Sequence, residues 1–368
     1  MELQQLESLF EDLKTKRMIC WGKGKHYRNI TEPFLKESGL ISNLEGVVEG
    51  KEELDSLLEL KKDSFSFAKD VVILVAVKGY NEICTQIQRN PKWKDMKAIP
   101  ALYLEALYED KLMLAAKKPP IYFRKNERPV IPKVIHTFWF SEEGLPPKYE
   151  MCLNTWKTYA PDFEIKIWNL ESYHPGECLF FQQAVSEKNW AFASDYARAD
   201  VLRRFGGVYM DLDVEMLRPI DELLYNDAYM GFESMERIEC GSGMGAKKGN
   251  KLLDEICKSY ENRPYFKEDG SWDNSTCPVR YTQVIEKHGL VKNGGFQMVE
   301  DITIYPFEVL TGKSFDTGII YKTKDSFTTH HHRGNWVPHS AHHAMEKRYE
   351  EIEAFLREQT CKNQGKRR

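Results

Sequence analysis

The segment from residue 193 to residue 213 constrains the fold of this chain more than any other part of it. Its sequence is ASDYARADVLRRFGGVYMDLD, in which a helical pattern leads through Gly206 and Gly207 into a short apolar strand. The strand ends in Asp211 and Asp213, and alternate residues of an extended backbone point to the same side. Because ligands of open α/β sheets bind at the carboxyl ends of strands, this order predicts an α/β fold with a polar site at a strand end.

Asp211 and Asp213 are candidate ligands of a divalent metal ion. Two carboxylates on one side of a strand offer the oxygen ligands that hard cations prefer. A cation held by few protein ligands keeps coordination positions for phosphate oxygens. The pair therefore predicts a site for a phosphate-bearing substrate. The alternative, an Asp-x-Asp in an ordinary surface turn, is disfavoured by the strand that precedes it.

The overall composition is that of a soluble globular protein. The 368 residues are enough for two domains with separate cores, and 42% hydrophobic and 29% charged residues are usual values. The net charge of −4 provides no strong field for nucleic acid, so we expect no nucleic-acid partner. The eight cysteines include no Cys-x-x-Cys pair, which argues against a zinc site and suits a reducing compartment.

The two ends of the sequence predict a cytoplasmic protein. Residues 1–10 have the polar pattern of an amphipathic helix rather than of a signal peptide. The longest apolar run, residues 71–77, is too short to cross a bilayer. Residues 362–368 carry four basic side chains and predict a solvated tail. A peripheral contact with anionic lipid at the inner face of the membrane is the alternative.

Two domains are expected, joined by a linker. Residues 1–116 alternate strands and helices as in a small Rossmann-like α/β domain, with a helical pattern from about Tyr80 to Lys117. Prolines and polar residues at 117–130 predict the linker. Residues 131–340 form the second α/β domain, and residues 341–368 predict a C-terminal amphipathic helix with a basic tail.

The N-terminal domain carries an incomplete dinucleotide-binding loop. Gly22 and Gly24 lie between a strand and a helix, but Tyr27 takes the position of the third glycine. Glu49 is the one acidic residue near the end of the second strand. We expect a scaffolding or regulatory role for this domain rather than a nicotinamide-cofactor site.

Asp195 and Arg198 form a second charged pair, on the helix that precedes the aspartates. They are three positions apart and so share a helix face. One explanation is a structural ion pair near the helix start. The other is a carboxylate and a guanidinium that hydrogen-bond sugar hydroxyls. A separate apolar stripe is expected to pack inward: Phe192, Tyr196, Ala199 and Leu202.

Three motifs together carry a resemblance to a known family. They are Ser194-Asp-x-x-Arg198, Gly206-Gly-Val-Tyr-x-Asp-x-Asp213, and Ile131-Pro-Lys-Val-Ile-His-x-x-Trp139. In this order they resemble glycosyltransferase family 32, the Asp-x-Asp sugar transferases that include fungal initiating mannosyltransferases and bacterial capsule enzymes. The resemblance covers about residues 131–339. It implies the GT-A nucleotide-sugar transferase fold, a mixed central sheet flanked by helices, here preceded by the Rossmann-like domain.

The resemblance also implies roles for individual residues. Asp211 and Asp213 would bind Mn²⁺ or Mg²⁺ and, through it, the diphosphate of a nucleotide-sugar donor. Asp195 and Arg198 would hold hydroxyls of the transferred sugar. Trp139 would stack on the nucleotide base, whereas a core position is the alternative for this residue.

A histidine-rich segment provides further candidates. The family commonly has His-His, three residues, and Ser-Trp in this region; His330, His331 and Trp336 match, and Asn335 replaces the serine. His330 and His331 are thus candidate metal ligands, and Asn335 and Trp336 candidate donor-binding residues. A solvated histidine-rich loop is the alternative. In a second departure, Cys277 stands where the family has the glycine of a Thr-Gly-Pro turn.

Taken together, the residues and the resemblance predict a metal-dependent retaining glycosyltransferase. It would move a hexose from a nucleotide-diphosphate sugar to a hydroxyl of a glycan or lipid-linked glycan, in surface or capsular polysaccharide synthesis. One alternative is a haloacid-dehalogenase-like phosphatase with Asp211 as nucleophile and Asp213 as acid/base. Another is a non-catalytic protein that binds nucleotide sugars or carbohydrates.

Overall fold

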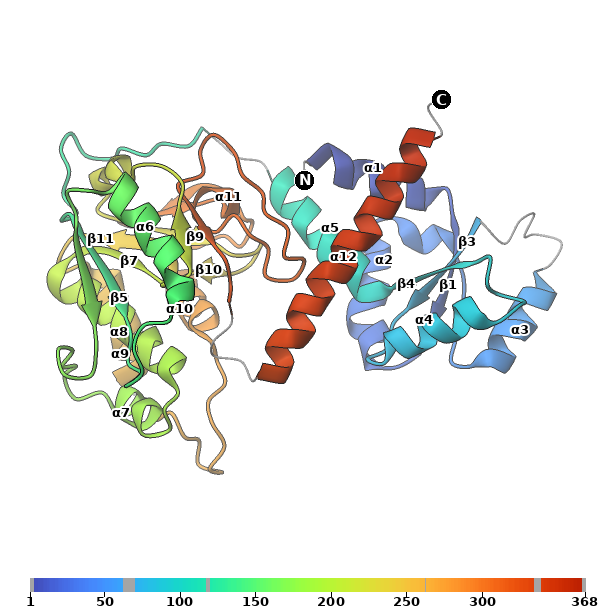
Figure 1. Cartoon of the computed structure of the whole chain (residues 1–368), viewed down its shortest axis with the longest axis horizontal. Helices are drawn as coiled ribbons and strands as arrows, with labels where there is room; N and C mark the ends of the chain where they lie inside the picture. Colours follow the sequence, from blue (N-terminus) through green and yellow to red (C-terminus); the bar gives the residue numbers. More distant parts are fainter. Residues whose placement is uncertain (1–2, 62–69, 117–119, 262, 334–338, 366–368) are drawn as a thin grey trace. The chain divides into compact units, whose positions relative to one another are not determined.

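The computed structural model describes residues 3–61, 70–116, 120–261, 263–333 and 339–365 (Figure 1). The chain divides into two compact units. Unit 1 consists of Met1–Ala115 together with Glu350–Arg368, and unit 2 of Ala116–Tyr349. No helix among the described residues has both the length and the apolar character needed to cross a membrane.

Unit 1 is built on a four-stranded parallel sheet with the strand order β2-β1-β3-β4. Its strands are β1 (Arg17–Trp21), β2 (Leu44–Val48), β3 (Val71–Val75) and β4 (Lys97–Pro100). Its helices are α1 (Leu3–Lys14), α2 (Glu32–Glu37), α3 (Lys51–Leu60), α4 (Tyr80–Arg89) and α5 (Ala101–Ala115), with short turns η1 (Tyr27–Thr31) and η2 (Leu40–Asn43). Strand β3 is buried along its whole length, as its apolar, β-branched sequence predicts.

The helical pattern expected from about Tyr80 to Lys117 is interrupted by a strand. The chain instead forms α4, strand β4 and α5 in this region. Two prolines explain the interruption, because Pro91 follows the end of α4 and Pro100 precedes α5, and neither fits a helix interior. Between them, Ile99 is 1% exposed in the sheet.

Gly22 serves the packing of the sheet in unit 1. Its φ of +121° lies in the region that favours glycine, and a Cβ there would lie 2.8 Å from a side-chain atom of Val77 and 2.9 Å from the carbonyl oxygen of Ala76. The following residue, Lys23, forms an ion pair with Glu53. The glycine therefore allows the segments after β1 and β3 to approach closely.

The C-terminal helix α12 (His339–Gly365) lies in the segment where the sequence pattern predicts an amphipathic helix and extends into the expected basic tail. From Glu350 onward it belongs to unit 1, where Ile352 is buried and Glu351 accepts a hydrogen bond from the hydroxyl of Tyr103. The preceding turns belong to unit 2, where Tyr349 donates a hydrogen bond to the carbonyl of Phe315 over 2.7 Å.

Unit 2 is built on a mixed eight-stranded sheet. Its strand order is β12-β13-β9-β11-β7-β5-β6, with β10 paired to β9. The strands are β5 (Val134–Phe138), β6 (Glu164–Trp168), β7 (Gly207–Met210), β9 (Ala228–Phe232), β10 (Ile238–Glu239), β11 (Ser242–Ala246), β12 (Gln297–Val299) and β13 (Ile302–Tyr305). Strands β5, β6 and β7 are parallel, whereas β11 is antiparallel to both of its neighbours. A separate antiparallel pair consists of β8 (Val214–Met216) and β14 (Thr328–His330).

Helices cover both faces of this sheet. They are α6 (Glu150–Tyr159), α7 (Leu179–Ser186), α8 (Trp190–Phe205), α9 (Lys251–Glu261), α10 (Cys277–Glu286) and α11 (Phe307–Leu310), with short turns η4 (Pro147–Tyr149) and η5 (Asp221–Tyr225). Tyr209 of β7 joins the core under α7 to α10, whereas Val208 and Met210 join the core under α6. This alternation is the period of a strand buried on both faces. The predicted α/β class with a mixed, helix-flanked sheet is therefore confirmed.

Helix α8 is buried on all sides rather than along one stripe. All its residues from 192 to 202 are buried, including Asp195 and Arg198. The expectation of an apolar stripe separate from the charged pair is thus too simple. The helix contacts both strands β5 and β7 and helices α7 and α9. Its polar residues must therefore find partners inside the unit.

The predicted linker, 117–130, begins with residues that lie outside the described part of the chain. Beyond them, residues of this segment pack within unit 2. The ring of Phe123 lies 5.0 Å from that of Phe327, and the backbone N–H of Val130 donates to the carbonyl of Leu224 over 2.9 Å.

Candidate functional site

The glycine pair between α8 and β7 sets the position of the aspartates. Gly206 and Gly207 both have positive φ, and a Cβ on Gly207 would lie 2.6 Å from the carbonyl oxygen of Val134. His136 Nε2 lies 2.9 Å from the Gly206 carbonyl, and His136 Nδ1 accepts from the indole N–H of Trp168 over 3.1 Å. Burial lowers the pKa of His136. Its neutral ring holds the corner through which the chain enters β7.

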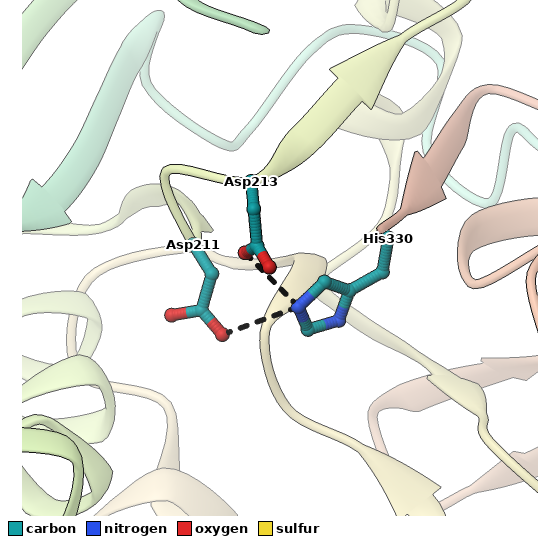
Figure 2. A group of neighbouring side chains, drawn as sticks. All are labelled: Asp211, Asp213 and His330. Carbon is teal, nitrogen blue, oxygen red and sulfur yellow. Dashed lines mark ion pairs between the residues drawn. The ribbon is translucent and has the colours of Figure 1, made fainter. Parts of the chain in front are cut away.

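Asp211 and Asp213 lie in a tight turn directly after β7. The strand ends at Met210, and the backbone N–H of Val214 donates to the carbonyl of Asp211 over 3.0 Å. The sequence pattern correctly indicates that a strand leads to the pair. The turn, rather than the pleat of an extended strand, brings the two carboxylates to the same side (Figure 2).

His330 completes a group of three potential metal ligands. It is the last residue of β14 and pairs with Val214 of β8, so strand pairing carries it to the aspartates. Its Nε2 lies 3.2 Å from Asp213 Oδ1 and 3.8 Å from Asp211 Oδ2 (Figure 2). One ligand atom from each of the three residues lies within 4.8 Å of the others. Two carboxylate oxygens and an imidazole nitrogen fit a divalent cation.

Asp213 and His330 strongly affect each other's protonation. Burial alone would raise the pKa of Asp213, but the His330 imidazolium and a hydrogen bond from the backbone N–H of Arg333 hold it well below its usual range. Burial opposes a charge on His330, yet the carboxylates of Asp213 and Glu239 raise its pKa well above the usual range. The imidazolium therefore compensates part of the negative charge of the surrounding carboxylates.

Asp195 and Arg198 lie beside this group, on α8. Arg198 Nη2 lies 3.2 Å from Asp195 Oδ1 and 3.6 Å from Asp211 Oδ1. The guanidinium thus connects the helix pair to the aspartate turn. Burial raises the pKa of Asp195 to about 6, although Arg198 opposes this effect.

The structure adds two residues to this region that the motif analysis did not assign to it. The hydroxyl of Tyr209 donates a hydrogen bond to Asp211 Oδ1 over 2.5 Å. The thiol of Cys277 lies 3.6 Å from Arg198 Nη1. Cys277 therefore places a side chain against the charged pair on α8.

The remaining predicted site residues have different surroundings. Trp139 donates its indole N–H to the Glu143 carbonyl over 2.6 Å and packs edge-to-face on Tyr149. His331 does not join the metal-ligand group, because its Nε2 lies 3.1 Å from Glu215 Oε2. Asn335 and Trp336 lie outside the described residues.

One cleft of about 980 Å³ connects these groups. Its lining includes Trp139 and the indoles of Trp190 and Trp272, and also the charged residues Asp195, Arg198, Asp211, Asp213 and His330. This volume is at the upper end of the range for small-molecule pockets, in which a few polar groups converge within a largely apolar lining. The cleft can accommodate a ligand with both a charged and a ring-containing part.

Comparisons with known proteins relate this site to sugar transfer. Residues 146–230 match the family model described as "Glycosyltransferase sugar-binding region containing DXD motif". The matched segment contains four of the predicted site residues: Asp195, Arg198, Asp211 and Asp213. Trp139 and His330 lie outside it.

Two curated relatives are inositol phosphoceramide mannosyltransferases of Schizosaccharomyces pombe. The chain is 30% identical to mannosyltransferase 3 over 146 residues, which are 38% of this chain and 39% of the relative. It is 30% identical to mannosyltransferase 1 over 106 residues, which are 27% of this chain and 33% of that relative. The chain thus spans well under half the length of either relative.

Among solved structures, the PaToxG glycosyltransferase is similar with 18% sequence identity and a TM-score of 0.32. The similarity covers 50% of this chain and 77% of that chain.

Proposed function

We propose that this chain is a metal-dependent glycosyltransferase whose donor is a nucleotide-diphosphate sugar. The convergence of Asp211, Asp213 and His330 beside Asp195 and Arg198 in one cleft is the observation that carries this proposal. The match of residues 146–230 to a glycosyltransferase sugar-binding region supports it. The names of the relatives favour mannose as the first hexose to test.

The proposed ligands of the cation are Asp211, Asp213 and His330. A mixed set of oxygen and nitrogen donors favours Mn²⁺ over Mg²⁺, whose protein ligands are predominantly oxygen. When bound, the cation would neutralise the charge that develops on the departing diphosphate. His331 is left out of the proposed ligand set because its side chain contacts Glu215 instead.

Asp195 and Arg198 are proposed to hold the transferred sugar. The Asp195 carboxylate lines the cleft and can accept hydrogen bonds from sugar hydroxyls. Arg198 fixes the direction of this carboxylate through their 3.2 Å contact and can donate to a sugar or phosphate oxygen. Trp139 is proposed to cover the nucleotide base. Asn335 and Trp336 are proposed to bind the donor at its phosphates.

We further propose transfer to a hydroxyl of a glycan or lipid-linked glycan, with retention of configuration. In such a transfer the acceptor attacks from the face that the diphosphate leaves. The departing diphosphate oxygen can then take the acceptor proton, so a separate carboxylate base is not required.

A direct experiment is a screen of nucleotide sugars against the full chain with and without Mn²⁺. We expect one donor to stabilise the protein thermally and to be slowly hydrolysed, and both effects to disappear with EDTA. Asp195→Ala should abolish hydrolysis but retain binding of Mn²⁺ and the free nucleoside diphosphate. Metal-independent binding, or full hydrolysis by Asp195→Ala, would overturn the proposal.

The phosphatase alternative is less compatible with the strand order. A haloacid-dehalogenase-like enzyme carries its Asp-x-Asp on the first strand of its domain. Here β5 and β6 precede β7, and β7 has the antiparallel neighbour β11. An assay with an aryl phosphate distinguishes the two functions, and we expect no turnover.

A further inference from the structure

Glu239 is a buried carboxylate next to the proposed metal ligands, to which neither the motif analysis nor the family match gives a role. It ends the short strand β10, opposite Gly231 of β9, and is 5% exposed. Both of its carboxylate oxygens accept from the backbone N–H of Gly241, over 3.0 and 2.9 Å. The carboxylate is therefore held in one orientation.

The same segment packs directly on the aspartate turn. The backbone N–H of Asp211 donates to the Gly241 carbonyl over 2.8 Å. A Cβ on Gly241 would collide with the carboxylate of Asp211. The position of Glu239 is thus coupled to that of the turn through the backbone rather than through a mobile side chain.

Glu239 contacts the nitrogen of His330 that faces away from the aspartates. Its Oε1 lies 2.9 Å from His330 Nδ1, and the hydroxyl of Ser242 lies 3.2 Å from the same nitrogen. A carboxylate accepts hydrogen bonds and cannot donate them, so Nδ1 carries a proton in this contact. In a neutral ring, the lone pair then belongs to Nε2, the nitrogen that lies toward Asp211 and Asp213 (Figure 2).

We propose that Glu239 is a positioning residue for the metal site. It holds His330 in the tautomer and ring orientation in which Nε2 binds the cation together with Asp211 and Asp213. Carboxylates that receive the second N–H of a metal-binding histidine contribute in this way to metal affinity. The inference rests on the proposed metal site and is independent of which sugar or acceptor is used.

The neighbouring pair of His331 and Glu215 provides a matched contrast. It too joins a histidine to a glutamate, with 3.1 Å between His331 Nε2 and Glu215 Oε2. His331 does not belong to the metal-ligand group. Removal of this second carboxylate should therefore leave metal binding unchanged.

The test is Mn²⁺ binding to the full chain, measured by titration calorimetry or by the paramagnetic resonance signal of free Mn²⁺. Glu239→Ala should weaken Mn²⁺ affinity by about 10- to 100-fold. Glu239→Gln keeps one hydrogen-bond acceptor for His330 Nδ1 and should lose less Mn²⁺ affinity than Glu239→Ala. Glu215→Gln should match the unchanged protein within about twofold.

A double variant separates positioning from general support of the fold. If Glu239 acts through His330, adding Glu239→Gln to His330→Ala should cause no further loss of Mn²⁺ affinity. Unchanged Mn²⁺ affinity in both Glu239 variants, or a full additional loss in the double variant, would overturn the inference. If the unchanged protein fails to bind Mn²⁺, the proposed function fails instead, so the two failures are distinguishable.

Discussion

Each unit of this protein has a corner, which is a turn that contains glycine and lies next to a parallel strand. Among the described residues, a group of potential metal ligands follows only the corner in unit 2. After β1 of unit 1, Gly22 allows close packing against Ala76 and Val77. At the start of β7 in unit 2, Gly206 and Gly207 do the same. In the described part of the chain, the group of potential metal ligands lies beyond β7. Glycines at such corners thus indicate close backbone packing. The capacity to bind a ligand depends instead on the polar side chains that follow.

The largest expected effect comes from removing a charge at the corner in unit 2. Asp213→Asn should lower Mn²⁺ affinity and nucleotide-sugar hydrolysis by more than about 100-fold, because it removes a proposed ligand. The matched change in unit 1 is Glu53→Gln, which removes the carboxylate bonded to Lys23. Calorimetry and a hydrolysis assay should show no effect of this change on either property. Equal losses in the two variants would remove the distinction between the corners.

A smaller loss of metal binding is expected from crowding the aspartates. Gly241→Ala places a methyl group against the carboxylate of Asp211, which must move away. We expect Mn²⁺ affinity to fall by about tenfold, which is within the range of losses caused by changing residues that support metal ligands. Gly144→Ala is the control, since no atom lies within 4 Å of its added Cβ. If both variants bind Mn²⁺ as tightly as the unchanged protein, the turn adapts more freely than its packing indicates.

The two corners should behave alike when only packing is changed. Gly22→Ala and Gly207→Ala each force a side chain into positive φ and against a backbone carbonyl oxygen. Each should reduce the free energy of unfolding of its unit by roughly 1–3 kcal/mol. Gly24→Ala, with open space around it, should have little effect in denaturant titrations. An unchanged free energy of unfolding in Gly207→Ala would contradict the packing explanation of this corner.

The smallest effect concerns the pH dependence of sugar recognition. The pKa of Asp195, about 6 because of burial, means that this carboxyl group becomes protonated as the pH falls through this value. The capacity of Asp195 to accept hydrogen bonds from sugar hydroxyls then declines. The affinity for the nucleotide sugar, divided by that for the free nucleoside diphosphate, should fall up to about tenfold between pH 7 and pH 5. This ratio cancels effects on the metal, and Asp195→Asn should make it independent of pH.

The sequence places four of the candidate site residues close together along the chain. Asp195 and Arg198 lie on α8, and Asp211 and Asp213 lie in the turn that follows β7. The periodicity of this continuous segment is visible in the sequence. The structure brings all four to one cleft. The strand order of unit 2 depends on packing between distant segments. Single-sequence periodicity does not contain this information.

The distant members of the site show the same limit. His330 was identified through a motif resemblance, but the motif does not distinguish it from His331. Adjacent residues on an extended backbone point in opposite directions, so only one of them can face the aspartates. Glu239 reaches the site through the pairing of β10 with β9, and no local pattern marks it. The departure at Cys277 is visible in the sequence, but the contact of its thiol with Arg198, from the start of α10, is not.

The pairing of β8 with β14 has a consequence for the biosynthesis of the protein. The strands lie far apart in the sequence of unit 2, and His330 reaches the aspartates only through this pairing. A nascent chain still on the ribosome can therefore form the aspartate turn long before it acquires the imidazole. The group of potential metal ligands is complete only once the chain has been made through β14, so chains that stop before β14 cannot assemble it.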